Sequence, residues 1–285
     1  NSSRVVLFLQ GPASIFWSEL AHELQARGVR VLRVRLSAAD HIYWRRPNAI
    51  SYRGSLAEWP RFLDNLIERE SVDDIIFYAD RPPYHACAAE LAAARGIGCH
   101  VIENGYLRPD WITLERRGMG AYSGFPEDPA TIRGIASGLP EPDFEVRYRH
   151  EFARLAFHEV VYDLANWFGR PLHPHFDADK YYNPLIDFLS WLPRLLHAPR
   201  LRRAAARVEA WHPSQRFWLL PLQLQADYQI RANSHYGLLS EMLDEVISSF
   251  AAHADGGDRL VVKVHPHDNG LERWDRVVER IAAAR

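Results

Sequence analysis

Short apolar runs alternate with helical patterns over roughly the first hundred residues. Continuous apolar runs of this length are typical of strands buried on both faces of a parallel sheet. The four runs occupy residues 4–9, 29–34, 74–78 and 99–102. Between them, apolar residues recur at the spacing of amphipathic helices, which we expect over residues 14–27, 56–70 and 83–95. Gly28 and Gly96 are expected to end two of these helices.

A strand and helix alternation at this spacing predicts parallel βαβ units with right-handed crossovers. We therefore expect a Rossmann-like domain over residues 1–140. The pattern then changes. Residues 144–211 are helical in pattern, rich in aromatic, Arg and Pro residues, and broken near residues 169–171 and at Asn183-Pro184. This predicts a helical segment over residues 141–211.

The alternating pattern returns near residue 212. Strands are expected over residues 216–221 and 259–264, and helices over residues 237–252 and 271–284. This predicts a second Rossmann-like unit over residues 212–285. Two strands are fewer than the four to six or so of a closed doubly wound domain. We therefore expect that a C-terminal portion lies beyond this sequence. The fold class is α/β, with two Rossmann-like units that face a cleft.

Composition narrows the function classes. The chain has 285 residues, 47% of them hydrophobic and 25% charged, as in soluble globular proteins. Its formal net charge of -2 argues against a nucleic-acid-binding protein. Cys87 and Cys99 lack metal-ligand spacing, so buried thiols in a reducing compartment are expected. Neither a signal-peptide pattern nor an apolar run long enough for a membrane span is present, which predicts a cytoplasmic protein.

Candidate chemistry lies at the carboxyl ends of the predicted strands, where open α/β sheets bind ligands. Four such loops carry polar or glycine residues, which favours a cleft between the two units. They are residues 10–12, 103–109, 221–227 and 265–268.

In the first unit, Gly11 would let the backbone approach an anion, although Gly-Pro is also an ordinary turn. Glu103 could act as an acid or a base if partial burial raises its pKa, or it could be a turn residue on the surface. Arg108 could bind a carboxylate or phosphate through its planar fork, or it could be a solvated loop arginine.

In the second unit, His265 ends a predicted strand and is followed by Pro266, which restricts its backbone. Such a histidine can donate a hydrogen bond to a phosphate. His267 and Asp268 follow, but successive strand side chains point to opposite faces, which argues against a metal site. Asp227 lies in the loop after the preceding strand. It could be a nucleophile or a base, or the N-cap of a helix.

A basic stretch lies within the helical segment. Its arginines alternate with Trp191, Leu195, Leu196 and Trp211, a pattern that fits either an anionic lipid surface or a solvated helix face. The arginines are Arg194, Arg200, Arg202, Arg203 and Arg207.

Four blocks of the sequence resemble one known family, the capsule polysaccharide biosynthesis and export proteins of Gram-negative bacteria, of the KpsS and KpsC type. The blocks follow in the family's order over nearly the whole chain, and the second is long and specific. They are residues 9–12, 103–115, 221–230 and 263–266.

The resemblance implies a GT-B architecture and a retaining transfer of β-Kdo from CMP-Kdo. It implies a lysophosphatidylglycerol or Kdo-linker acceptor at the inner membrane, and capsule assembly or export proteins as partners. Neither a cofactor nor a catalytic metal is implied. The family continues with a further block rich in Ser, Thr and Gly that helps to bind the nucleotide, so we expect weak donor binding by residues 1–285 by themselves.

The resemblance also implies residue roles. Asp227 would be the nucleophile, Glu103 the acid/base, and Arg108 the partner of the Kdo carboxylate. His265, also counted as catalytic, and Lys263 would hold the CMP phosphate. The remaining substrate-binding residues would be Gly11, Asn104, Gly105, Gln223 and Pro266. Two alternatives stay open: a transferase that uses another nucleotide sugar, and a non-catalytic scaffold of capsule assembly.

Overall fold

The computed structural model describes residues 3–107, 110–148, 152–210 and 216–285. The chain divides into two compact units, Asn1–Asp179 and Lys180–Arg285. The predicted helical segment, residues 141–211, therefore contributes to both units. The predicted boundary near residue 212 falls among residues 211–215, which lie outside the described residues.

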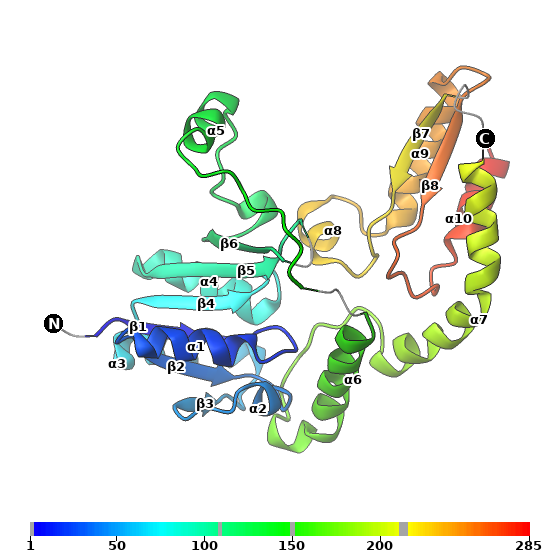
Figure 1. Ribbon diagram of the computed structural model, residues 1–285. Coiled ribbons are helices and arrows are strands. Elements are labelled where there is room, and N and C mark those ends of the chain that lie inside the picture. The colour runs from blue at the N-terminus through cyan, green and yellow to red at the C-terminus, as the bar shows by residue number, and fades with distance from the viewer. Residues whose placement is uncertain (1–2, 108–109, 149–151, 211–215) are drawn as a thin grey trace. The chain divides into compact units, whose positions relative to one another are not determined.

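The first unit is built on a six-stranded sheet of order β3-β2-β1-β4-β5-β6 (Figure 1). Neighbouring strands are parallel, except that β6 is antiparallel to β5. A mixed α/β fold with a parallel sheet is thus confirmed. The strands are β1 (Val5–Phe8), β2 (Arg30–Arg35), β3 (Ala49–Ser51), β4 (Asp74–Tyr78), β5 (Gly98–Asn104) and β6 (Ile112–Arg116).

Helices cover both faces of this sheet. Trp17 and Ala21 of α1 (Phe16–Ala26) pack on one face. On the other face lie α3 (Trp59–Glu70), preceded by the short helix η1 (Leu56–Glu58), and α4 (Pro83–Arg95). Gly28 and Gly96 follow α1 and α4 with φ of 81° and 65°, a backbone conformation that suits glycine, and the predicted helix ends are confirmed.

Two strands of the first sheet were not predicted. β3 has three residues and follows α2 (Asp40–Tyr43), between the strand predicted over residues 29–34 and the helix predicted over residues 56–70. β6 is an edge strand whose residues are exposed or half-buried in alternation. Neither carries a long apolar run, because each borders solvent. The short helix η2 (Gly120–Tyr122) and α5 (Pro129–Ala136) come after β6.

The helical segment of the first unit is shorter than predicted. Residues 144–148 form a loop, because the Asp110 carboxylate accepts the backbone N–H groups of Arg147 and Tyr148, both at 2.9 Å. The helix α6 covers Phe152–Phe168, and η3 covers Arg170–Leu172. The predicted break near Gly169 is confirmed.

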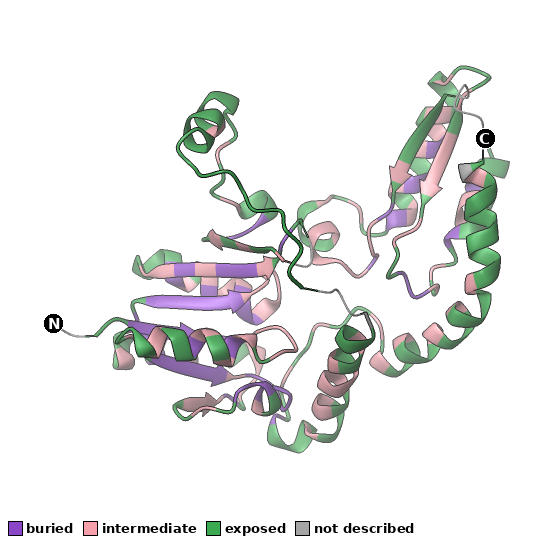
Figure 2. Cartoon of the chain, viewed as in Figure 1, coloured by how far each residue is buried: buried purple, intermediate pink, exposed green. Residues whose placement is uncertain are grey.

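The second unit contains a two-stranded parallel sheet, β7 (Phe217–Pro221) with β8 (Arg259–Lys263). Its helices are α7 (Pro184–Glu209), α8 (Tyr228–Asn233), α9 (Leu239–His253) and α10 (Trp274–Ala283). A small core joins α9 and α10 to the sheet, centred on Leu243 and Trp274. In Figure 2, burial is concentrated in the strands of the first unit, whereas β7 is largely exposed. Within the described residues, no helix combines the length and apolarity needed to cross a membrane.

Candidate functional site

The loop after β1 passes directly over an indole ring. A Cβ added at Gly11 would lie 2.6 Å from Cγ of Trp17, so only glycine fits without a shift of the neighbouring ring. Nε1 of Trp17 donates to the carbonyl oxygen of Leu9 at 2.7 Å and fixes the ring below the loop. Gly11 therefore lies at the predicted carboxyl end of the strand, and it also has a packing role.

Beside this loop lies a buried polar cluster that the sequence analysis missed. Nε2 of Gln10 donates to the Tyr162 hydroxyl at 2.6 Å and to the Ser37 hydroxyl at 3.3 Å. Arg33 and Asp40 form an ion pair at 2.6 Å, and their side chains are 3% and 4% exposed. The Tyr162 hydroxyl is desolvated, which raises its pKa and keeps it protonated. The signal in the sequence was Arg33 itself, a charge within an apolar strand.

At the end of β5, Glu103 and Asn104 are the last two residues of the strand, whereas the sequence placed them after it. Antiparallel pairing extends the strand, with Glu103 opposite Thr113. Glu103 is half-buried and Asn104 is exposed.

The turn that follows β5 is closed by Gly105. Its N–H donates to the carbonyl oxygen of Trp111 at 2.9 Å. A Cβ at Gly105 would collide with that oxygen, so the turn requires glycine. Arg108, proposed to bind a carboxylate, lies outside the described residues.

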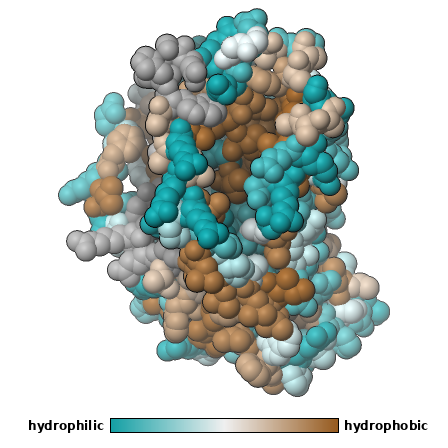
Figure 3. Space-filling view, turned by 90° about the vertical axis from the view of Figure 1, so that its right-hand side faces the viewer, coloured by the Kyte–Doolittle hydropathy of each residue, from teal (hydrophilic) through white to brown (hydrophobic). Residues whose placement is uncertain are grey.

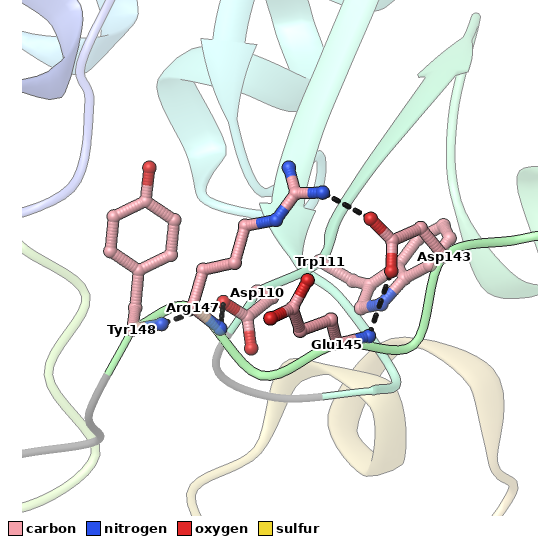
Figure 4. A pocket seen from close by; sticks show the side chains of 6 residues that line it. All are labelled: Asp110, Trp111, Asp143, Glu145, Arg147 and Tyr148. Atoms are coloured by element: carbon pink, nitrogen blue, oxygen red, sulfur yellow. Dashed lines mark hydrogen bonds and ion pairs between the residues drawn. The ribbon is translucent and has the colours of Figure 1, made fainter.

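A shallow pocket of about 190 Å³ is lined by residues of this turn and of the loop at 143–148. Figure 4 shows its lining side chains, several of which are already engaged with one another: Arg147 pairs with Asp143, and Asp110 accepts backbone N–H groups. The pocket includes none of the predicted site residues. Its lining residues are Asp110, Trp111, Asp143, Glu145, Arg147 and Tyr148.

In the second unit, the parallel pairing of β7 and β8 brings two predicted loops to one sheet edge. Pro221 lies opposite Lys263 at the end of the register. The N–H of Leu222 then donates to the carbonyl oxygen of Lys263 at 2.8 Å. The loop that holds Gln223 and Asp227 and the loop that holds His265 therefore begin side by side. The Lys263 side chain is exposed at this edge.

Asp227 is the N-cap of α8. Its carboxylate accepts the N–H of Gln229 at 2.8 Å, the helix-capping alternative considered for this residue. Gln223 is half-buried and accepts the N–H of Leu224 at 3.0 Å.

Gln225, which was not singled out from the sequence, is a further structural residue of this loop. It is 2% exposed. Its side-chain oxygen accepts the N–H of Leu239 at 2.8 Å and so links the loop to α9.

The loop after β8 orients the imidazole of His265. Its Nδ1 accepts the backbone N–H of His267 at 3.1 Å. The neutral ring must then carry its proton on Nε2, which can donate to an anionic oxygen. Pro266 is exposed and restricts the backbone of His265. Asp268 is buried and accepts from Nε1 of Trp274 at 2.9 Å, so its role is structural.

Neither a metal-binding cluster nor a reactive thiol is found among the described residues. In the part of the chain that the structure describes, no three His, Cys, Asp or Glu side chains are grouped to hold a metal ion. Both cysteines are free thiols, and burial raises the pKa of Cys87 and of Cys99 to about 11. Thiols with such pKa values carry little thiolate at neutral pH and are poor nucleophiles.

The molecule is thus an α/β protein with a Rossmann-like parallel sheet, and polar loops lie at the carboxyl ends of its strands. The sequence profile of the capsule polysaccharide biosynthesis protein family matches residues 73–285, and the chain belongs to this family. The resemblance stated from the sequence is confirmed.

Two relatives illustrate the match. The capsule polysaccharide export protein KpsS of Escherichia coli is 30% identical over 285 residues, which are 99% of this chain and 72% of that protein. The capsule polysaccharide modification protein LipB of Neisseria meningitidis serogroup A is 27% identical over 290 residues, covering 98% of this chain and 68% of that protein.

Solved structures give a weaker likeness. UDP-GlcNAc 2-epimerase of Neisseria meningitidis bound to UDP-GlcNAc shares 12% identity over 98% of this chain and 69% of that chain, with a TM-score of 0.29. The MnaA–UDP structure from S. aureus shares 13% identity over 99% of this chain and 66% of that chain, with a TM-score of 0.30. TM-scores of this size do not establish a shared fold.

Proposed function

We propose that this protein is a glycosyltransferase of capsular polysaccharide synthesis, which transfers β-Kdo from CMP-Kdo to a lysophosphatidylglycerol or Kdo-linker acceptor with retention. The observation that carries the proposal is the edge of the β7-β8 sheet. There, Lys263 ends β8, and Asp227 and His265 lie in the two loops that begin side by side after β7 and β8. In the GT-B-like organisation that we propose, the first unit binds the acceptor and the second binds the donor.

The donor's phosphate suits the groups at the end of β8 and in the loop that follows. The ammonium of Lys263 and the Nε2–H of His265 both donate to anionic oxygens. Gln223 and Pro266 border the same edge and are proposed to shape the nucleotide site. Both phosphate contacts would stabilise CMP as it leaves.

Retention follows from two displacements in sequence. The Asp227 carboxylate would attack the anomeric carbon of Kdo, and the bond from that carbon to the CMP phosphate oxygen would break. The acceptor hydroxyl would then attack the same carbon and release Asp227, while Glu103 removes the hydroxyl proton. Arg108 is proposed to hold the Kdo carboxylate, and Gly11, Asn104 and Gly105 to line the acceptor side.

One observation favours a second candidate, a non-catalytic scaffold of capsule assembly. The Asp227 carboxylate already has a structural task as the N-cap of α8. In a scaffold, this cap would be the whole reason for an aspartate at this position.

A transfer assay separates the two candidates. CMP-Kdo generated in situ is offered with a fluorescent lysophosphatidylglycerol or with a Kdo-primed acceptor, to residues 1–285 and to a C-terminally extended chain. Asp227→Asn is the informative variant, because asparagine caps helices as well as aspartate does but is not a nucleophile.

If the protein is a transferase, the wild type should form product, and Asp227→Asn should lower the transfer rate by a factor of the order of 10³ or more without changing thermal unfolding. Glu103→Gln should also slow transfer. No product from either chain on either acceptor would support the scaffold, and product with another nucleotide sugar only would reassign the donor.

A further inference from the structure

The first half of helix α7, which contains Pro193, exposes a row of apolar residues. Six of its residues, each between 50% and 79% exposed, recur at three- and four-residue spacing and therefore lie on one face of the helix. We call them the leucine stripe. They are Leu185, Phe188, Leu189, Leu192, Leu195 and Leu196.

The opposite face of α7 contacts the rest of the second unit. Oδ1 of Asp187 accepts a hydrogen bond from Nδ2 of Asn269 at 2.8 Å. Trp191, Arg194 and Ala198 lie on the same side as Asp187 and are half-buried. The core of the second unit includes none of the stripe residues among those described. The leucine stripe therefore faces outward from its own unit.

Beyond its first turn, α7 carries only positive charge up to its last residue, Glu209. Residues 188–208 contain five arginines and neither Asp nor Glu, in a chain whose net charge is -2. Four of these arginines are exposed. No ion pair among the described residues includes any of the five. On the face that carries α7, Figure 3 shows apolar side chains gathered beside long hydrophilic ones.

We propose that α7 is a membrane-docking helix that lies on an anionic phospholipid surface. The leucine stripe would enter the boundary between headgroups and acyl chains, and Arg200, Arg202, Arg203 and Arg207 would contact lipid phosphates. Both halves of the surface are needed for this assignment. A nucleic acid would use the arginines but not six aliphatic and aromatic side chains, whereas an anionic bilayer uses both.

This surface goes beyond the proposed transfer reaction, which it would serve by bringing the enzyme to a lipid acceptor. Vesicle binding is measured without donor or acceptor. The docking proposal can therefore fail while the transferase proposal holds, and the transferase proposal can fail while docking holds. The purified chain is floated with vesicles of phosphatidylethanolamine and phosphatidylglycerol, and with vesicles of phosphatidylcholine. Binding is expected only to the anionic vesicles and should weaken as salt is raised.

The two halves of the surface are tested by two double variants. Leu192→Gln with Leu196→Gln should weaken vesicle binding by about 100-fold, because the apolar surface of two leucine side chains is no longer transferred from water into the bilayer. Arg202→Ala with Arg203→Ala should weaken it by roughly 25-fold and reduce its salt dependence.

Matched controls come from exposed residues of the first unit. Leu139→Gln with Leu164→Gln, and Arg133→Ala with Arg154→Ala, should bind vesicles like the wild type. Circular dichroism and thermal unfolding verify that each variant is folded.

Three results would overturn the proposal. They are equal binding to neutral vesicles, loss of binding in the control variants as much as in the α7 variants, and an absence of vesicle binding. A self-associating wild type that Leu192→Gln with Leu196→Gln makes monomeric, without vesicle binding, would assign the stripe to a second copy of the chain instead.

Discussion

Two strands with similar sequences have very different surroundings. β1 and β7 are both short apolar runs, and both pair in parallel. All four residues of β1 are buried. In β7, Phe217, Trp218 and Leu219 are 58%, 58% and 54% exposed.

The difference lies in the neighbours of each strand. β1 is flanked by β2 and β4, and helices cover both faces of its sheet. β7 pairs with β8 in a two-stranded sheet. An apolar run therefore predicts a strand well, but its burial is decided by elements that are distant in the sequence. The same contrast extends to the ion pairs of the two units.

The largest expected effect breaks the buried ion pair of the first unit. Arg33→Leu would leave the Asp40 carboxylate buried without its cation, which should lower the free energy of unfolding by roughly 3–5 kcal/mol. Chemical denaturation measures this change. The control is Arg285→Ala in the second unit, because both side chains of the Arg285–Asp244 pair are exposed. Little or no change is expected there, and equal effects in the two variants would contradict the contrast.

A smaller effect is expected from core truncation. Leu7→Ala removes a side chain with 0% exposure and should lower the free energy of unfolding by about 2–5 kcal/mol. Leu219→Ala removes a side chain that is still largely in water, so its effect should be under about 1 kcal/mol. Denaturant titrations measure the free energy of unfolding of each variant, and hydrogen exchange shows which unit has lost stability. If Leu219→Ala were as costly as Leu7→Ala, then β7 would be covered in solution.

The first unit should also lose stability in acid through His85. Burial lowers the pKa of His85 to about 4, from about 6.5 in the unfolded chain. The neutral form is therefore favoured by folding. The stability that depends on neutral His85 is fully present above pH 6.5. It is lost progressively as the pH falls from 6.5 through 4.

Between pH 7 and pH 5, the loss should be about 2 kcal/mol. Thermal or denaturant unfolding across this range measures it. His85→Asn, which does not titrate, should remove most of this pH dependence, and an unchanged pH profile in that variant would place its origin elsewhere.

The smallest effect concerns the turn after β5. Gly105→Ala forces a Cβ against the carbonyl oxygen of Trp111, which should cost about 1 kcal/mol as the turn shifts. Gly124→Ala meets no atom within 4 Å and is the matched control. Denaturation compares the two variants, and hydrogen exchange at the Gly105 amide reports on the turn itself. Equal stability and exchange in both would show that the turn adjusts freely.

Much of the fold could be predicted from the sequence, because its strongest signals are local. Four of the six strands of the first unit follow from apolar runs, and the ends of α1 and α4 follow from the positions of Gly28 and Gly96. β3 and β6 could not be found, because short strands at a sheet edge bury too little to leave an apolar run.

The candidate site could be predicted only in part. The loops after β7 and β8 meet at one edge because parallel strands end together. The cluster of Gln10, Arg33, Asp40 and Tyr162 could not be found, since Gln10 and Tyr162 are separated by 152 positions. The cap that Asp227 provides is a local feature, and the sequence alone left it beside the catalytic interpretation.

The loop after β8 has a consequence for ligand affinity. It is tied to its own unit at three points: Asp268 with Trp274, Asn269 with Asp187, and Glu272 with Tyr182. Ordering a free backbone costs roughly 1–2 kcal/mol of conformational entropy per residue. The loop around His265 is already ordered by folding, so a ligand that binds there does not have to order it. More of the contact energy then remains as affinity.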